Sequence, residues 1–197
     1  MAGGSLPGGS LLPEGQSYGI PIVVDPVLVS TSGGVLLDAG GRAALTEALF
    51  PLAALVTPNV PEAAALLGEA LAADEAALVA QGRRLLGFGS GAILLKGGHR
   101  YAGRADTSAG CAGDTVAGGQ HADHSDVEDA VDLLISGGTA NGHTLERIAS
   151  QRVAGTSRGT GCALASAIAA GLAAGKPLSE ACRAAKNYVL GMLTPVS

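Results

Sequence analysis

The sequence contains no tryptophan, and aromatic residues of all kinds make up only 3% of its 197 residues. Charged residues are also scarce, at 15%, and no stretch of the chain concentrates lysine or arginine. The net charge of −5 and the lack of a basic face argue against a nucleic-acid partner, because such binding needs cations that displace counterions. A nucleotide ligand is not excluded, since backbone N–H groups, one lysine and a metal ion are enough to hold phosphates.

Cysteines are few, and they form no Cys-X-X-Cys pair. Their odd number, with Cys111, Cys162 and Cys182, favours reduced thiols over a disulfide framework. No apolar run reaches the roughly 18 residues that a membrane span needs. Residues 1–19 lack the positively charged region and the continuous apolar region of a signal peptide. We therefore expect a cytoplasmic protein with no membrane partner.

The apolar content, 47% of the chain, is carried mainly by alanine, leucine and valine, which suit a layered α/β core. Short apolar runs at residues 20–24, 52–57 and 92–96 have the pattern of buried parallel strands. They alternate with helical segments, as in βα units with right-handed crossovers. The predicted helices lie at residues 42–49, 59–67 and 74–86. We expect a three-layer αβα domain with a mostly parallel sheet over residues 20–197.

The C-terminal part continues this pattern after an interruption. Residues 100–127 show neither helical nor strand periodicity, so we predict a flexible insertion there. Strands are predicted at residues 131–135 and 145–149, and an apolar helix at 162–174 suits complete burial. A last helix is predicted after Pro177. Its apolar face comprises Leu178, Ala181, Cys182, Ala185, Tyr188, Val189 and Met192.

Polar side chains follow the ends of three predicted strands. Asp25 follows the first strand, Asn59 and Glu62 follow the second, and Lys96 ends the third. Ligands of open α/β sheets bind beyond the carboxyl ends of the strands, so these side chains are candidate site residues. Each also has a structural interpretation: Asn59 and Glu62 suit a helix cap, Asp25 a turn, and Lys96 a solvated strand end.

A glycine-rich loop, Arg-Gly-Thr-Gly-Cys at residues 158–162, leads into the apolar helix. Unpaired backbone N–H groups and the helix dipole at such a terminus attract anions, and Gly159 and Gly161 let the backbone wrap one. The same field should lower the pKa of the Cys162 thiol. The alternative interpretation is a tight turn followed by a buried cysteine.

Two other patterns have weaker functional interpretations. Residues 111–115 echo the Gly-Ala-Gly-Asp anion hole of ribokinase-type sugar kinases, but the segment that follows is polar and does not suit the buried helix which that motif requires. This argues against Asp114 as a catalytic residue. His121 and His124 lie in the same polar segment, and we expect them to be solvated rather than metal-bound.

The ordered motifs resemble those of the phosphomethylpyrimidine kinases, a ribokinase branch that carries cysteine where sugar kinases carry aspartate. The resemblance covers residues 20–99 and 129–193. The matching segments are Val-Val-Asp-Pro-Val at 23–27, Thr-Pro-Asn-Val-Pro-Glu at 57–62, Lys-Gly-Gly-His at 96–99 and Gly-Thr-Gly-Cys at 159–162. The resemblance implies a ribokinase-like fold. Because residues 1–19 match none of the family's opening segment, we expect a sheet that lacks the family's first strands.

The resemblance also implies roles on the phosphoryl-transfer side of the site. Cys162 would be the general base that takes the proton of the acceptor hydroxyl. Gly159, Thr160 and Gly161 would hold the charge of the transferring phosphoryl group, a kind of electrostatic stabilisation that dominates such reactions.

On the nucleotide side, the resemblance implies that Lys96, Asn59 and Gly161 contact ATP. Asp25 and Glu62 would hold Mg²⁺, partly through water, because that ion usually keeps several of its waters.

Three functions follow from the resemblance. The first is ATP-dependent phosphorylation of hydroxymethylpyrimidine or its phosphate in thiamine biosynthesis. The second is the pyridoxal kinase activity of the same branch. The third is a non-catalytic remnant or a nucleotide-binding subunit.

An unpaired strand at the edge of the sheet would also favour a homodimer.

Overall fold

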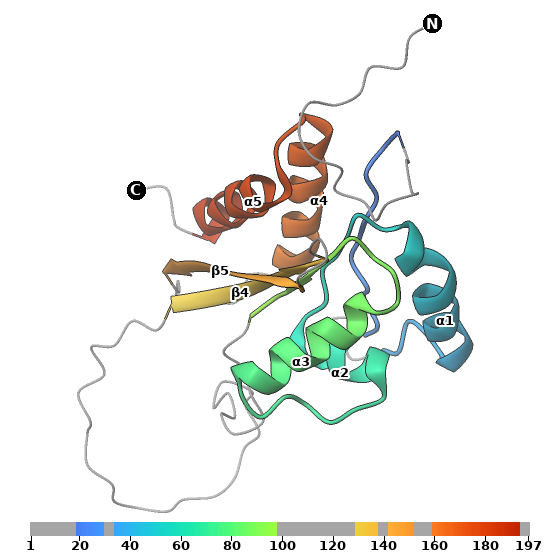
Figure 1. The fold of residues 1–197 in the computed structure, drawn as a ribbon. Coiled ribbons are helices and arrows are strands. Elements are labelled where there is room, and N and C mark those ends of the chain that lie inside the picture. Colours follow the sequence, from blue (N-terminus) through green and yellow to red (C-terminus); the bar gives the residue numbers. More distant parts are fainter. Residues whose placement is uncertain (1–18, 30–33, 98–128, 138–141, 152–158, 194–197) are drawn as a thin grey trace, which may run out of the picture.

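The computed structural model describes residues 19–29, 34–97, 129–137, 142–151 and 159–193. These residues form a five-stranded sheet with helices on both faces (Figure 1). The strands are β1 (Val23–Val24), β2 (Leu55–Val56), β3 (Ala92–Leu95), β4 (Asp129–Ser136) and β5 (Thr144–Gln151). The helices are α1 (Ala39–Ala44), α2 (Val60–Leu67), α3 (Glu75–Leu86), α4 (Thr160–Ala173) and α5 (Leu178–Leu193). A π-helical turn (Leu45–Leu49) and a 3₁₀ turn (Phe50–Leu52) follow α1.

The predicted three-layer α/β class is confirmed, but the sheet is mixed rather than mostly parallel. The strands lie in the order β1-β2-β3-β4-β5, and β1, β2 and β3 are parallel. β4 runs antiparallel to both β3 and β5. The connection from β4 to β5 spans residues 137–143, which is too short for the crossover that a parallel pair needs.

The core consists of two apolar layers, one on each face of the sheet. On one face, α2 and α3 pack against Val56, Ile93 and Leu133. On the other face, α4 and α5 pack against Leu55 and Leu94. Neighbouring residues of β2 and of β3 therefore point to opposite layers, as the alternation of a strand requires. No helix in the described part of the chain is long and apolar enough to cross a membrane.

The ends of the helices confirm the local signals of the sequence. Asn59 caps α2 and Gly68 ends it with a positive φ of 68°. Asp74 caps α3 by accepting a hydrogen bond from the backbone N–H of Ala77. The first helix differs from its prediction, because Asp38 caps it and α1 therefore begins at Ala39 instead of at residue 42.

The strands are shorter than the apolar runs predicted. Leu52 belongs to the 3₁₀ turn, which Pro51 favours through its fixed φ, so β2 begins only at Leu55. Lys96 lies beyond the end of β3, where it forms an isolated parallel bridge with Asn59.

The two C-terminal helices are less buried than expected. Only one face of α4 is buried, because the other face is not covered by any described residue; the buried residues are Leu164, Ala165, Ile168 and Leu172. In α5, Tyr188 and Met192 are 59% and 57% exposed instead of joining the core. Lys186, which the sequence analysis left out of the apolar face, is buried.

Several predictions concern residues outside the described ranges. These are the unassigned segment up to residue 18, the predicted insertion at 100–127 with Cys111, Asp114, His121 and His124, and two motif residues, His99 and Arg158.

Candidate active site

The candidate site lies where the parallel strands end. Lys96 and Asn59 are paired across the ends of β3 and β2, and the backbone N–H of Lys96 donates to the carbonyl of Pro58 over 2.9 Å. Asp25 follows β1, the next strand of the same parallel set. The predicted convergence of these three residues on one edge of the sheet is therefore present in the structure.

Asp25 is the centre of this group. Its Oδ1 atom accepts hydrogen bonds from Lys96 Nζ at 2.6 Å and from Thr57 Oγ1 at 3.0 Å. Its Oδ2 atom is buried and has no hydrogen-bond partner among the described residues. An unpaired buried carboxylate oxygen is costly, so this atom marks a place where a ligand would be favourable.

Asn59 and Glu62 form the capping box of α2. The Asn59 side chain accepts from the Glu62 backbone at 2.7 Å, and Glu62 Oε2 accepts from the Asn59 backbone at 2.8 Å. Burial raises the pKa of the Glu62 carboxyl above its usual value, and the nearby charge of Asp25 adds to this, although the Asn59 N–H and Lys96 oppose it. The prediction that Asn59 and Glu62 cap a helix is thus correct. One oxygen of the Glu62 carboxylate and one of the Asp25 carboxylate take no part in the hydrogen bonds given above.

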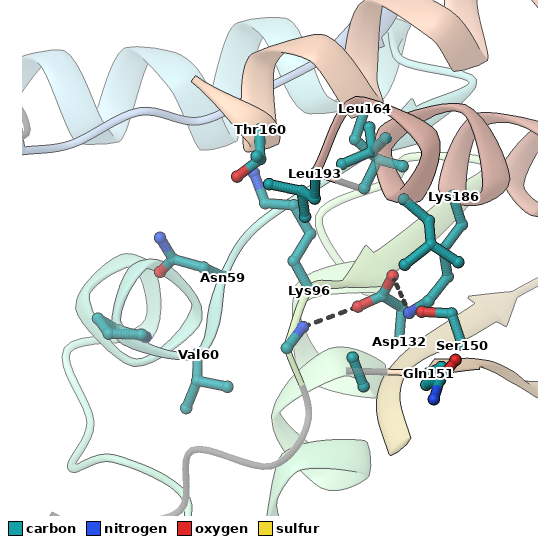
Figure 2. A pocket seen from close by; sticks show the side chains of 16 residues that line it. Asn59, Val60, Lys96, Asp132, Ser150, Gln151, Thr160, Leu164, Lys186 and Leu193 are labelled. Carbon is teal, nitrogen blue, oxygen red and sulfur yellow. Dashed lines mark hydrogen bonds and ion pairs between the residues drawn. The ribbon is translucent and has the colours of Figure 1, made fainter. Parts of the chain in front are cut away.

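The glycine-rich loop enters α4 beside Lys96. Gly159 occupies the N-cap position with a φ of +83°, a conformation that favours glycine. A Cβ atom at Gly161 would lie only 3.2 Å from Lys96 Nζ, so glycine allows the lysine to approach the helix terminus closely. Figure 2 shows the Lys96 side chain reaching toward Thr160 at the start of α4.

Cys162 lies in the first turn of α4 and is exposed. The expectation that the helix terminus lowers the pKa of its thiol is wrong. Interaction with the Asp25 carboxylate raises the pKa of the Cys162 thiol above its usual value, and burial and the charges of Asp25 and Glu62 act in the same direction, whereas Lys96 opposes them. The carboxylate of Asp25 is therefore the main cause of the shift. The alternative of a buried cysteine is also wrong.

A cavity of about 470 Å³ adjoins this group and is of the size of a small-molecule site. Four of the predicted site residues line it, namely Asn59, Lys96, Thr160 and Gly161. The other four, Asp25, Glu62, Gly159 and Cys162, do not line it. The predicted residues are thus divided between a cavity and a carboxylate–thiol group, and the Lys96–Asp25 ion pair joins the two.

The rest of the cavity wall is largely aliphatic, with polar groups at one side (Figure 2). The aliphatic residues come from the start of α2 and from α4 and α5; they are Val60, Pro61, Leu164, Val189, Leu190 and Leu193. Such walls accommodate the apolar faces of a planar ring, while the convergent polar groups fix its orientation.

Two charged residues of the wall were missed by the sequence analysis. Lys186 of α5 donates to Asp132 Oδ2 of β4 at 2.7 Å, and Asp132 Oδ1 accepts from the backbone N–H of Gly97 at 2.8 Å (Figure 2). Asp132 interrupts the apolar run of the strand predicted at residues 131–135, and Lys186 follows Cys182 by four residues on the buried helix face. Both signals were present in the sequence.

The described residues contain no cluster of three or more His, Cys, Asp or Glu side chains that could hold a metal ion. A magnesium site does not require one, because Mg²⁺ is usually held by one or two carboxylates together with phosphates and water. The free Oδ2 of Asp25 and the adjacent, desolvated Glu62 fit this donor set.

Comparisons with known proteins agree with this geometry. The family model for phosphomethylpyrimidine kinase matches residues 12–195. A hydroxymethylpyrimidine/phosphomethylpyrimidine kinase of Rhizobium meliloti (strain 1021) is 40% identical over 175 residues, which are 88% of this chain and 54% of that relative. The chain thus spans about half the length of this relative.

Solved structures agree as well. A phosphomethylpyrimidine kinase from Clostridium difficile 630 is similar with a TM-score of 0.59 and 28% identity, over 88% of this chain and 58% of that one. An ADP complex of Bacillus subtilis pyridoxal kinase is similar with a TM-score of 0.61 and 26% identity, over 84% of this chain and 50% of that one. They confirm the ribokinase-like fold. The family match, which covers almost the whole sequence, shows that the chain belongs to the phosphomethylpyrimidine kinase family.

Proposed function

We propose that the protein is an ATP-dependent kinase that phosphorylates hydroxymethylpyrimidine or its phosphate in thiamine biosynthesis. The observation that carries this proposal is the convergence of Lys96, the N-terminus of α4 and two carboxylates beside one cavity. Phosphoryl transfer is catalysed mainly by positioning and by charge stabilisation, and this group supplies cations, backbone donors and metal ligands.

The cavity is the proposed ATP site. Lys96 and Asn59 line it close to Thr160 and Gly161, so they would hold the phosphates where the backbone N–H groups of α4 are unpaired. The aliphatic wall would receive the base. The ADP complex of the similar pyridoxal kinase supports a nucleotide in this fold.

Asp25 and Glu62 are the proposed holders of Mg²⁺. When bound there, Mg²⁺ would neutralise phosphate charge and offset the effect of Asp25 on Cys162. Lys96 forms an ion pair with Asp25, and its flexible side chain could also reach phosphates held beside it.

Cys162 is the proposed general base. As a thiolate it would accept the proton of the acceptor hydroxyl while the hydroxyl oxygen forms a bond to the γ-phosphorus. The bond from that phosphorus to the bridging oxygen breaks at the same time, and ADP leaves. Gly159, Thr160 and Gly161 would stabilise the charge of the transferring group through their N–H groups.

Two other functions remain as alternatives. The similarity to Bacillus subtilis pyridoxal kinase supports pyridoxal as a second acceptor. The third function is a chain that binds nucleotide without transferring phosphate by itself, or a non-catalytic remnant.

A coupled assay of ADP release distinguishes these functions. Hydroxymethylpyrimidine, its phosphate and pyridoxal are supplied in parallel with MgATP, and ATP binding is measured by calorimetry on the same preparation. We expect ADP release with one or both pyrimidines. Release only with pyridoxal supports the second function, and ATP binding without release supports the third. A chain that does not bind ATP contradicts both kinase functions and a nucleotide-binding subunit, and leaves only a non-catalytic remnant.

A further inference from the structure

The ion pair between Asp132 and Lys186 is the most buried charged pair in the described part of the chain. Each residue is only 8% exposed, and both line the cavity. Asp132 uses both carboxylate oxygens, one for Lys186 Nζ at 2.7 Å and one for the Gly97 N–H at 2.8 Å. Hydrogen bonds of Asp132 therefore connect β4 to α5 and to Gly97, which follows β3.

Stability alone does not account for such a pair. Removing two charges from water costs about as much as their attraction returns, and apolar side chains of similar size are often equally stable in such places. Asp132 lies two residues before Leu134 on β4, and Lys186 follows Cys182 by four residues on α5; Leu134 and Cys182 both belong to the apolar layer between the sheet and α4 and α5. A leucine and a methionine would suit these surroundings.

The hydrogen bond to Gly97 points to another role. Gly97 directly follows Lys96 and has a φ of +70°, so the chain turns sharply just after the lysine. The backbone N–H of Lys96 is bound to Pro58 on one side, and the next peptide N–H is bound to Asp132 on the other. The main chain around Lys96 is thus fixed from two neighbouring elements, which determines where its side chain starts.

We propose that Asp132 is a positioning residue for Lys96 and that Lys186 holds Asp132 in place. The inference depends on the proposed function, because it assigns the purpose of the arrangement to binding of the ATP phosphates. Asp132 contributes through the Gly97 peptide and not through contact with the nucleotide.

Three variants of the full chain separate this role from a structural one. Asp132→Ala leaves Lys186 buried without its partner, so the melting temperature should fall. The affinity for ATP should also fall by a factor of about ten or more, as expected for loss of a charge-assisted hydrogen bond. Asp132→Ala with Lys186→Met removes both charges, so most of the melting temperature should return while ATP affinity stays low. The control is Lys176→Met with Glu180→Ala, which removes an exposed pair away from the cavity and should leave ATP affinity unchanged.

The variants are compared by calorimetric titration with MgATP in the absence of an acceptor. If the double variant regains affinity together with stability, the pair is only structural and the inference is wrong. If the wild-type chain binds no ATP, the proposed function is wrong as well, so the two failures are distinguishable.

A second comparison tests whether Asp132 acts through Lys96. Lys96→Ala should weaken ATP binding, and adding Asp132→Ala and Lys186→Met to it should weaken binding little further, because the positioned group is already absent. Fully additive losses would show direct contact of Asp132 or Lys186 with the nucleotide and would overturn the proposal.

Discussion

Cys162 and Asp25 are far apart in sequence, but the Asp25 carboxylate raises the pKa of the Cys162 thiol. If Cys162 takes the proton of the acceptor, Cys162→Ala should lower kcat by about 10²–10⁴, the usual contribution of a general base. Cys162→Ser should also be poor, because a hydroxyl is a far weaker base than a thiolate. ATP affinity should hardly change in either variant. Steady-state kinetics with the acceptor found by the ADP-release assay measure these effects.

Two further variants serve as controls for that experiment. Lys96→Ala should mainly weaken ATP binding, and Cys182→Ala should affect only packing, because Cys182 is buried against the sheet. A Cys162→Ala enzyme with near-normal kcat would contradict the mechanism and leave Asp114 as the next residue to test.

The raised pKa of Cys162 gives a prediction that does not depend on catalysis. Only the thiolate reacts with iodoacetamide, so alkylation of Cys162 should be slow at pH 8 and should accelerate as the pH rises through 9 and beyond. Asp25→Asn removes the main cause of the shift, lowers the pKa and should speed the reaction at pH 8. Peptide mapping by mass spectrometry follows each cysteine separately.

Cys182 is the internal reference for the alkylation. Burial raises its pKa to about 12, so it should remain unmodified over the same pH range. If Cys162 is alkylated at the same rate in the unsubstituted chain and in the Asp25→Asn variant, the carboxylate does not act on the thiol.

At the scale of elements, the N-caps of α2 and α3 form a matched pair. Asn59→Ala and Asp74→Ala each remove a side chain that accepts a backbone N–H at 2.7 Å. Each should lower the free energy of unfolding by about 1 kcal/mol in denaturant titrations. Only Asn59 lines the cavity, so only Asn59→Ala should also weaken ATP binding. A similar loss of affinity in Asp74→Ala would mean that helix stability, and not the Asn59 side chain, affects the site.

Features that depend on residues close together in sequence were predicted more accurately than features that depend on distant residues. The caps at Asn59, Asp74 and Gly68 depend on residues a few positions away, so the sequence predicts α2 and α3 almost to the residue. The direction of β4 depends on its pairing with β3 across a long intervening segment, and no local pattern encodes that direction.

The same distinction applies to the site. Asp25, Asn59, Glu62 and Lys96 each follow a recognisable strand end. The pKa of Cys162, in contrast, is determined by a carboxylate that only the folded chain brings near it. The partner of Lys186 is likewise 54 positions away, so the buried ion pair could not be predicted from the helix alone.

For the whole molecule, the order of the strands places β1 at one edge of the sheet, with no strand on its outer side among the described residues. Apolar side chains near it in sequence are exposed, among them Ile20 at 78% and Val35 at 74%. Open edges and exposed apolar residues favour association, so we expect a concentration-dependent dimer through this region.

Sedimentation velocity over a range of concentrations tests the dimer. Val35→Lys with Leu36→Lys should shift the chain toward monomer, whereas Leu71→Lys, an exposed apolar position between α2 and α3, should not. A single species at every concentration would contradict the expectation.

The register between β3 and β4 also determines what can be inserted into the protein. Leu95 pairs with Leu133, so the end of β3 lies close to the start of β4. Closing a flexible loop costs only about 0.6 kcal/mol more for each doubling of its length. A reporter domain whose termini lie close together could therefore be inserted between these two strands. Because Gly97 directly follows Lys96, such a reporter would test whether nucleotide binds beside Lys96, as proposed above.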